Sequence, residues 1–176
     1  MKLRSIWLNL ALVCSIPAYA STVLVGFSPA GAGPSAESVV LAAIGGAKQS
    51  IRMAAYSFTS KPIAGALVAA HRKGVDVQVV LDRSQRKEIY TGATYLANEG
   101  IPVRINGQYA IMHNKFMVID GISVETGSFN YTSAAAQKNA ENVFYIEDAP
   151  EIAITYGKEW ERLWAEAEAM VSGTGN

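Results

Sequence analysis

The chain is poor in the residue types that build disulfides and metal sites. It has 176 residues, with one cysteine and two histidines. A single cysteine, Cys14, excludes a disulfide within the chain and a zinc site built from several thiolates. The sequence also has no G-x-S-x-G stretch and no Gly-rich loop followed by Lys-Ser/Thr. These absences argue against a serine hydrolase with a nucleophile elbow and against a P-loop nucleotide site.

Neither sign of charge dominates the sequence. Fifteen basic residues balance 15 acidic ones, and half of the residues are hydrophobic. This composition excludes a disordered chain, and it lacks the basic excess typical of a dedicated nucleic-acid-binding protein. The length suits one domain with a hydrophobic core. Any binding of phosphate groups must therefore depend on a local cluster of basic side chains.

Residues 1–20 have the pattern of a secretory signal peptide. A basic start precedes an apolar run at 6–16, and Ala18-Tyr19-Ala20 provides small residues before a cleavage site. Cleavage near Ala20 would leave residues 21–176 as one domain, periplasmic or secreted. It would remove Cys14 and two of the 15 basic residues, so that 13 basic residues face 15 acidic ones, a net charge of −2. The alternative is an uncleaved anchor helix, although the apolar run is shorter than the about 20 residues that span a bilayer.

Strand and helix patterns alternate along the rest of the chain. Short apolar runs rich in β-branched residues predict strands, and apolar residues three or four apart predict helices. The expected strands are 22–27, 50–58, 75–81, 102–105, 111–119, 122–127 and 142–146. The expected helices are 35–48 and 61–73, with Ser35 and Ser60 as N-caps, 90–98 and 149–170. The alternation predicts an α/β protein, an αβα sandwich with a mixed central β-sheet.

Asp120-Gly121 stands between two apolar runs and predicts a β-hairpin. A two-residue loop would place Lys115 opposite Thr126 and His113 opposite Ser128. Because residues two apart on a strand share a face, these four side chains would gather at the end of the hairpin far from its turn.

The residues expected at this end of the hairpin suit chemistry at a phosphate group. His113 offers a nucleophilic nitrogen or a general acid and base, Lys115 offers a positive charge, and Ser128 and Asn130 offer neutral donors. The alternative is that His113 and Lys115 are ordinary residues of a solvated strand. Met117 continues the same face and indicates that it is buried, where a lysine needs a partner or a function.

The second histidine does not complete a metal site in the sequence. His71 lies in AAHRKG, at the end of a predicted helix, where interaction with the helix dipole is its simplest role. Zinc needs three or four protein ligands. We therefore expect no metal and no other cofactor.

The spacing of the candidate residues resembles the signature of the phospholipase D superfamily. The signature is carried by His113-x-Lys115-x4-Asp120, by Gly127-Ser128-x-Asn130 and by Glu141-Asn142, which stands where the family has an acidic residue. Similarity covers roughly residues 24–164. The pattern is nearest to small bacterial endonucleases of the superfamily that have one motif copy and resist EDTA. The αβα fold expected above is also the family's fold.

The resemblance implies a role for each motif residue. His113 would attack phosphorus and form a phosphohistidine, while a second histidine protonates the leaving oxygen and then activates water. Lys115 and Asn130 would hold the phosphate oxygens, with Ser128 nearby. Glu141 would orient and polarise His113.

Asp120 belongs to the motif but is expected to be structural. Seven strand steps of about 3.3 Å separate it from His113 by roughly 23 Å. Its expected role is in the tight turn or in a structural salt bridge.

A single motif implies a homodimer. The mechanism needs two histidines at one phosphorus, and His71 lacks the flanking pattern. We therefore expect His113 of two protomers to meet across a twofold axis, with the active site at the interface and both Lys115 side chains lining it. Arg83, Arg86 and Lys87 are candidates to extend this basic patch, or form an ordinary solvated loop.

The expected substrate is a nucleic acid, DNA or RNA, cleaved by a metal-independent endonuclease. The alternatives are a lipid phosphodiesterase of the phospholipase D type and a nucleic-acid-binding module without catalysis. No basic amphipathic helix favours a stable association with membranes. The last predicted helix has Trp160 and Trp164, for which packing in the core is the simplest role.

Overall fold

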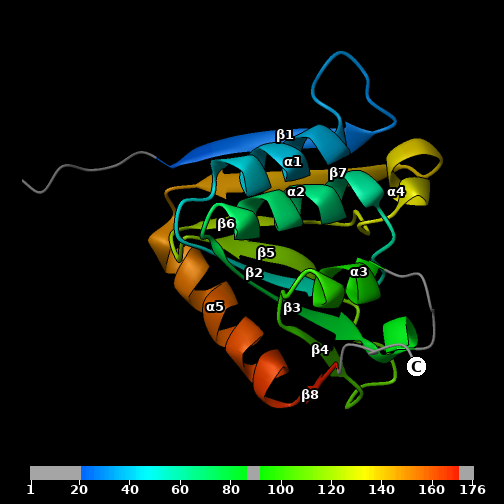
Figure 1. The fold of residues 1–176 in the computed structure, drawn as a ribbon. Helices are drawn as coiled ribbons and strands as arrows, with labels where there is room; N and C mark the ends of the chain where they lie inside the picture. The colour runs from blue at the N-terminus through cyan, green and yellow to red at the C-terminus, as the bar shows by residue number, and fades with distance from the viewer. Residues whose placement is uncertain (1–20, 87–91, 171–176) are drawn as a thin grey trace, which may run out of the picture.

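The computed structural model describes residues 21–86 and 92–170, which form a sheet with helices on both faces (Figure 1). The strands are β1 (Thr22–Ser28), β2 (Ser50–Ala55), β3 (Asp76–Asp82), β4 (Val103–Asn106), β5 (Lys115–Ile119), β6 (Ser123–Gly127), β7 (Glu141–Glu147) and β8 (Glu168–Ala169). The helices are α1 (Ala36–Gly46), α2 (Lys61–Arg72), the 3-10 turn η1 (Arg83–Arg86), α3 (Gly92–Asn98), α4 (Ser133–Gln137) and α5 (Pro150–Ala165). The predicted signal peptide, Lys87 and the C-terminal tail lie outside the described residues.

The eight strands form one mixed sheet in the order β1-β7-β6-β5-β2-β3-β4-β8. Strands β2, β3 and β4 are parallel to one another, whereas β5 runs antiparallel to β2, and β6, β7 and β1 continue antiparallel. The carboxyl ends of β2 and β3, the start of β5, the end of β6 and the start of β7 therefore lie along one edge of the sheet. This edge is where ligands bind in many α/β sheets.

Two apolar clusters on opposite faces of the sheet confirm the αβα sandwich. The larger cluster packs α1 and α2 against one face, where Met117 and Ile119 of β5 are buried. The smaller cluster packs α5 against the other face, over Phe116 and Val118. Helices α1 and α2 lie side by side above the sheet in Figure 1. Alternate residues of β5 thus enter different clusters, as expected for a strand that is covered on both faces.

The predicted helix N-caps are confirmed. The Ser35 side chain accepts the backbone N–H of Ser38 at 3.1 Å, and Ser60 accepts that of Ile63 at 3.4 Å. Each bond satisfies one of the amide groups that have no partner in a first helical turn.

Helix α5 is a core helix, as the sequence indicated. Trp160 is buried, and its Nε1 donates to the backbone carbonyl of Met53 at 2.9 Å. The prediction of a helix up to residue 170 was wrong, because α5 ends at Ala165 and Glu168–Ala169 pairs with β4 as strand β8. No described helix has the length and apolar character needed to cross a membrane.

The predicted hairpin is present, but its register differs by one residue. Asp120 and Gly121 both have positive φ, 53° and 69°, as the Asp-Gly turn predicted. The ladder nevertheless pairs Ile119 with Ser123, so Ile122 is an additional loop residue. Its carbonyl accepts the N–H of Ala149 at 2.7 Å, which ties the turn to the start of α5.

The shifted register overturns the prediction that Thr126 lies beside Lys115. Thr126 pairs with Phe116, not with Lys115. Thr126 therefore lies on the α5 side of the sheet, where its hydroxyl donates to the backbone carbonyl of Lys115 at 3.2 Å. His113 and Ser128 lie outside β5 and β6, so the predicted ladder pair between them does not form.

Asp120 anchors the hairpin turn to the loop before β2. Its carboxylate accepts the backbone N–H groups of Lys48, Gln49 and Ser50 at 2.7 to 3.1 Å. Its own N–H donates to the carbonyl of Ser50 at 2.9 Å. The turn and the chain at 48–50 are held at the sheet edge opposite to the start of β5, and the partners of Asp120 are amides rather than a basic side chain.

We expect Asp120→Ala to destabilise the protein without impairing the chemistry of the folded molecule. The variant loses three charge-assisted hydrogen bonds and places alanine at a positive φ, so the free energy of unfolding should fall by about 3 kcal/mol. Urea denaturation measures the loss. Asp120→Asn, which keeps one acceptor and tolerates the backbone conformation, should lose about half as much. A loss of turnover at unchanged stability would contradict this structural role.

Candidate active site

Four of the five predicted site residues lie close to the ends of neighbouring strands at one edge of the sheet. Lys115 begins β5 and His113 precedes it, Ser128 follows β6, and Glu141 begins β7. Because β5, β6 and β7 alternate in direction, the start of one strand adjoins the end of the next. Strand topology therefore brings these residues together, although the ladder register predicted from the sequence is wrong.

His113 is exposed and lies against two neighbours at this edge. Its ring packs on that of Tyr56, with centroids 4.7 Å apart and planes tilted by 53°. Tyr56 follows β2 and donates its backbone N–H to the carbonyl of Asn114 at 2.9 Å. The Lys115 ammonium lies 5.5 Å from the centroid of the Tyr56 ring. The imidazole thus has one open side and one side fixed by an aromatic ring and a cation.

Lys115 is 8% exposed and points its ammonium at His113. Nζ donates to the His113 carbonyl at 2.8 Å and lies 3.2 Å from Nδ1. Burial lowers the pKa of Lys115, and the nearby Glu141 carboxylate partly opposes this shift. A largely desolvated ammonium attracts an anion more strongly than one in water, so this side chain suits a phosphate group.

The contact between Lys115 and His113 bears on the tautomer of the imidazole. An ammonium donates hydrogen bonds and accepts none, so with Nδ1 as its acceptor a neutral ring would carry the proton on Nε2. Attack through Nε2 would need the proton on Nδ1 instead. Transfer of the Lys115 ammonium from Nδ1 to a bound phosphate would release Nδ1 and make this change of tautomer possible.

Glu141 is held by its neighbours at the start of β7. Its carboxylate accepts the Ser128 hydroxyl at 2.6 Å and the Asn139 amide at 3.0 Å. Ser128 in turn accepts the N–H of Asn142 at 3.0 Å. Within the described residues Glu141 hydrogen-bonds these groups and not His113, so its orientation of the imidazole stays a prediction. Its negative charge also acts on Lys115, where it partly offsets the lowering of the Lys115 pKa by burial.

Asn130 carries a buried polar atom without a partner. Among the described residues, Oδ1 of Asn130 is one of two buried side-chain atoms that make no hydrogen bond, and the other is the Ser28 hydroxyl. A buried acceptor without a partner costs about 1–3 kcal/mol and is often found where a ligand binds. Only the amide NH2 end of Asn130 can donate to a phosphate oxygen.

The loop that carries His113 is held on the side of β3. Asp82, at the end of β3, is 2% exposed, and its two oxygens accept the N–H groups of Met112 and Ser84, each at 2.8 Å. No site role was predicted for Tyr56 or Asp82. Their position at the ends of apolar parallel strands was the available signal, because polar residues there face the ligand edge of a sheet.

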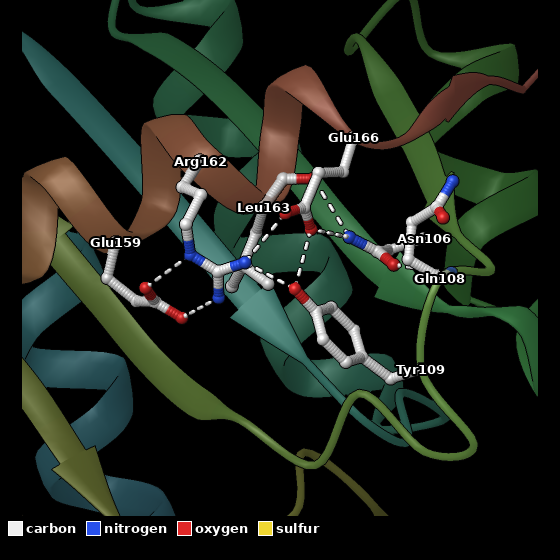
Figure 2. A network of polar contacts seen from close by, with 7 residues as sticks. All are labelled: Asn106, Gln108, Tyr109, Glu159, Arg162, Leu163 and Glu166. Carbon is white, nitrogen blue, oxygen red and sulfur yellow. Dashed lines mark hydrogen bonds and ion pairs between the residues drawn. The ribbon is translucent and has the colours of Figure 1, made fainter.

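The same loop is attached to α5 through the polar network of Figure 2. The Tyr109 hydroxyl donates to Glu166 at 2.8 Å and contacts the Arg162 guanidinium, which also pairs with Glu159 and Glu166. The hydrogen bond from Tyr109 holds the pKa of Glu166 below its usual range, with a further contribution from Asn106. The loop before His113 is therefore held at two positions, at Tyr109 by α5 and at Met112 by Asp82. A preorganised site requires such fixed positions.

Asp120 and His71 lie away from these residues. Asp120 follows β5 at the opposite edge of the sheet, and His71 lies in the last turn of α2, near the start of β3. Across residues 21–86 and 92–170, no three His, Cys, Asp or Glu side chains are grouped so that they could hold a metal ion.

Comparison with known proteins agrees with this arrangement. Residues 40–164 match the family described as cardiolipin synthase, PLD-like domain. The match covers most of the chain and contains every motif residue considered above. The chain belongs to the phospholipase D-like family.

A solved structure in this family is similar over nearly its whole length. Nuc from Salmonella typhimurium, described as a phospholipase D family member, is 42% identical, with a TM-score of 0.81 over 86% of this chain and 99% of Nuc. The predicted fold class and the predicted resemblance to small members of the superfamily are confirmed.

Curated relatives share the domain but are longer. A phospholipase D of Rickettsia bellii (strain RML369-C) is 44% identical over 114 residues, which are 65% of this chain and 56% of the relative. A mitochondrial cardiolipin hydrolase of Xenopus laevis is 38% identical over 132 residues, which are 75% of this chain and 62% of the relative. The chain thus spans less than two thirds of either relative.

Proposed function

We propose that this protein is a metal-independent phosphodiesterase, an endonuclease that cleaves DNA, or RNA, through a covalent phosphohistidine. The observation that carries the proposal is the exposed His113 imidazole, packed on Tyr56 and paired with the buried Lys115 ammonium. A nucleophilic nitrogen beside a desolvated cation suits a phosphodiester, because attack at phosphorus needs both a nucleophile and charge stabilisation.

The proposed reaction has two steps at one phosphorus. In the first, a ring nitrogen of His113 forms a bond to phosphorus, the bond to the leaving oxygen breaks, and a second histidine gives that oxygen a proton. In the second, the same histidine takes a proton from water, the water oxygen bonds to phosphorus, and the N–P bond breaks. Lys115 and the amide of Asn130 hold the non-bridging oxygens, and Ser128 lies nearby.

We propose that the second histidine is His113 of a second copy of the chain. His71 is a poor candidate, because it lies in the last turn of α2, near the start of β3, whereas the site lies at the end of β3. The seven residues of β3 span about 20 Å along the strand, so His71 is separated from the site by about this length. A homodimer with the active site at a twofold axis would supply the second imidazole and a second Lys115.

We further propose that the protein acts in the periplasm or outside the cell, after cleavage near Ala20. A stable association with membranes is not part of the proposal. The rival function is that of a lipid phosphodiesterase, which the names of the relatives from Rickettsia bellii and Xenopus laevis favour. The third alternative is a binding module without catalysis.

One assay separates the three functions. Purified protein is incubated in excess EDTA with plasmid DNA, with vesicles of phosphatidylcholine and with vesicles of cardiolipin. We expect nicked and then linear plasmid, with no release of choline or phosphatidic acid. Lipid hydrolysis without nicking would replace the nuclease by the lipid enzyme. If the protein bound DNA but hydrolysed none of the three substrates, it would be a binding module without catalysis. If EDTA abolished the nicking, the metal-independent mechanism would be refuted.

A further inference from the structure

A groove of about 660 Å³ opens beside His113, on the side of β3 and η1. Tyr56 lines the groove and also packs on the His113 ring. Ile111, two residues before His113, is another lining residue and is 53% exposed. The groove therefore adjoins the candidate active site through Tyr56. Its volume lies in the range of about 300–1,000 Å³ found for sites of drug-sized ligands, which exceeds the space needed for one phosphate group.

Two arginines and two acidic residues line the groove, but only one arginine forms an ion pair with one of these acids. The Asp82 carboxylate is buried and occupied by two backbone N–H groups. Arg86 pairs with Glu168 at 2.6 Å, and both side chains are exposed. Arg83 is exposed and makes no hydrogen bond or ion pair with residues 21–86 or 92–170. Within the part of the chain that the structure describes, the groove thus presents one cation without an anionic partner.

The groove is also lined by an aromatic ring and an exposed apolar side chain. The Tyr56 ring, whose centroid lies 5.5 Å from the Lys115 ammonium, and the Ile111 side chain offer surfaces for stacking or apolar contact. A single-stranded polynucleotide presents phosphates and flat bases in alternation, so it binds where aromatic surfaces and basic side chains alternate. A phosphate monoester or a simple diester has only one phosphate group, so it offers no second phosphate for Arg83 to bind.

We propose that this groove is a subsite for the nucleotides next to the scissile phosphate, with Arg83 binding the neighbouring phosphate. The inference rests on the proposed nuclease function and adds to it a requirement for a polymeric substrate. Arg83 acts on substrate binding and takes no part in the bond changes at phosphorus.

The test compares Arg83→Ala on two substrates, a single-stranded 12-nucleotide DNA and bis(p-nitrophenyl) phosphate, which has one phosphate. We expect kcat/KM for the oligonucleotide to fall about tenfold more than kcat/KM for the small diester, mainly through KM. The slope of log KM against log salt concentration should fall by about one, as for loss of one phosphate contact. Arg83→Lys should restore the slope. Arg72→Ala is the matched control, because Arg72 is an exposed arginine on α2 outside the groove.

Each other outcome has a distinct meaning. Equal losses on both substrates, or no loss on the oligonucleotide, would overturn the subsite while the nuclease function stands. Plasmid nicking by the wild-type protein without cleavage of the oligonucleotide would overturn the subsite alone. Hydrolysis of the small diester without cleavage of either the oligonucleotide or plasmid DNA would overturn the nuclease function, and the subsite with it.

Discussion

His113→Asn abolishes hydrolysis of plasmid DNA, with an expected fall in kcat of at least about 10⁴-fold, because removal of a covalent nucleophile leaves only binding and electrostatic effects. The variant should fold normally. His113 is exposed, its backbone carbonyl still accepts the Lys115 ammonium, and asparagine fills part of the space beside Tyr56. Initial rates of plasmid nicking measure the effect, and thermal unfolding monitors the fold.

The same variant tests whether the active site is shared between two copies. Wild-type and His113→Asn chains with different affinity tags are coexpressed, and the mixed dimer is purified through both tags. If each site needs two imidazoles at one phosphorus, the mixed dimer is as inactive as the variant. Half of the wild-type activity in the mixed dimer would show that each protomer has its own complete site. Activity per chain should also fall on dilution below the dimer dissociation constant.

Lys115→Ala is the informative comparison for His113→Asn. Its ammonium is a charge for the phosphate and not the nucleophile, so its loss should leave a residual rate in which the covalent intermediate still forms. Rapid quenching in an alkaline denaturant, where a phosphohistidine persists, followed by detection of the phosphorylated chain distinguishes the two variants, since His113→Asn cannot form the intermediate at all.

The fold, and the gathering of most candidate site residues at one edge of the sheet, were largely accessible from the sequence. Apolar runs and serine caps marked most elements of the sheet and helices, because local propensity and burial agree there. The elements that were missed are short. Helix α4 has five residues and strand β8 has two, and each depends on neighbours distant in sequence. A two-residue strand exists only through its pairing with β4, for which no local pattern is diagnostic.

The geometry of the site was less accessible, for a physical reason. The Asp-Gly turn was predicted correctly, yet the additional loop residue Ile122 shifts the ladder because its carbonyl binds Ala149, 27 positions later. Such a tertiary hydrogen bond leaves no trace in the hairpin sequence. The grouping of His113 with Ser128 was expected from register but arises from strand ends along one sheet edge, which also explains why Tyr56 and Asp82 adjoin the site.

A buried acidic residue of β6, close in sequence to Ser128 and Asn130, is expected to make the stability of the protein depend strongly on pH. Glu125 of β6 is 1% exposed, and its carboxyl accepts the Tyr131 hydroxyl at 2.6 Å. Burial raises the pKa of Glu125 to about 8, although the hydrogen bond from Tyr131 opposes the shift. This bond joins the two ends of the segment that carries Ser128 and Asn130, so the ionisation state of Glu125 bears on the stability of the site.

The sign of the pH dependence follows from the direction of the shift. The folded protein holds the proton of Glu125 up to about pH 8, whereas the unfolded chain releases it near the ordinary value of 4.5. The contribution of this group to the free energy of unfolding is fully present below pH 4.5. It falls as the pH rises towards 8, by at most about 1.4 kcal/mol per pH unit, because the unfolded state then binds fewer protons.

Glu125→Gln should remove this dependence, because glutamine keeps the size and the acceptor oxygen for Tyr131 but does not ionise. Relative to the wild-type protein, we expect the variant to gain about 3 kcal/mol in free energy of unfolding between pH 5 and pH 8. Urea denaturation at pH 5, 6.5 and 8 measures the difference. Tyr131→Phe is the control, since loss of the donated hydrogen bond should raise the pKa of Glu125 further and extend the pH-dependent loss to more alkaline solution. Parallel stability profiles of the wild-type and Glu125→Gln proteins would mean that Glu125 is ionised in its buried position.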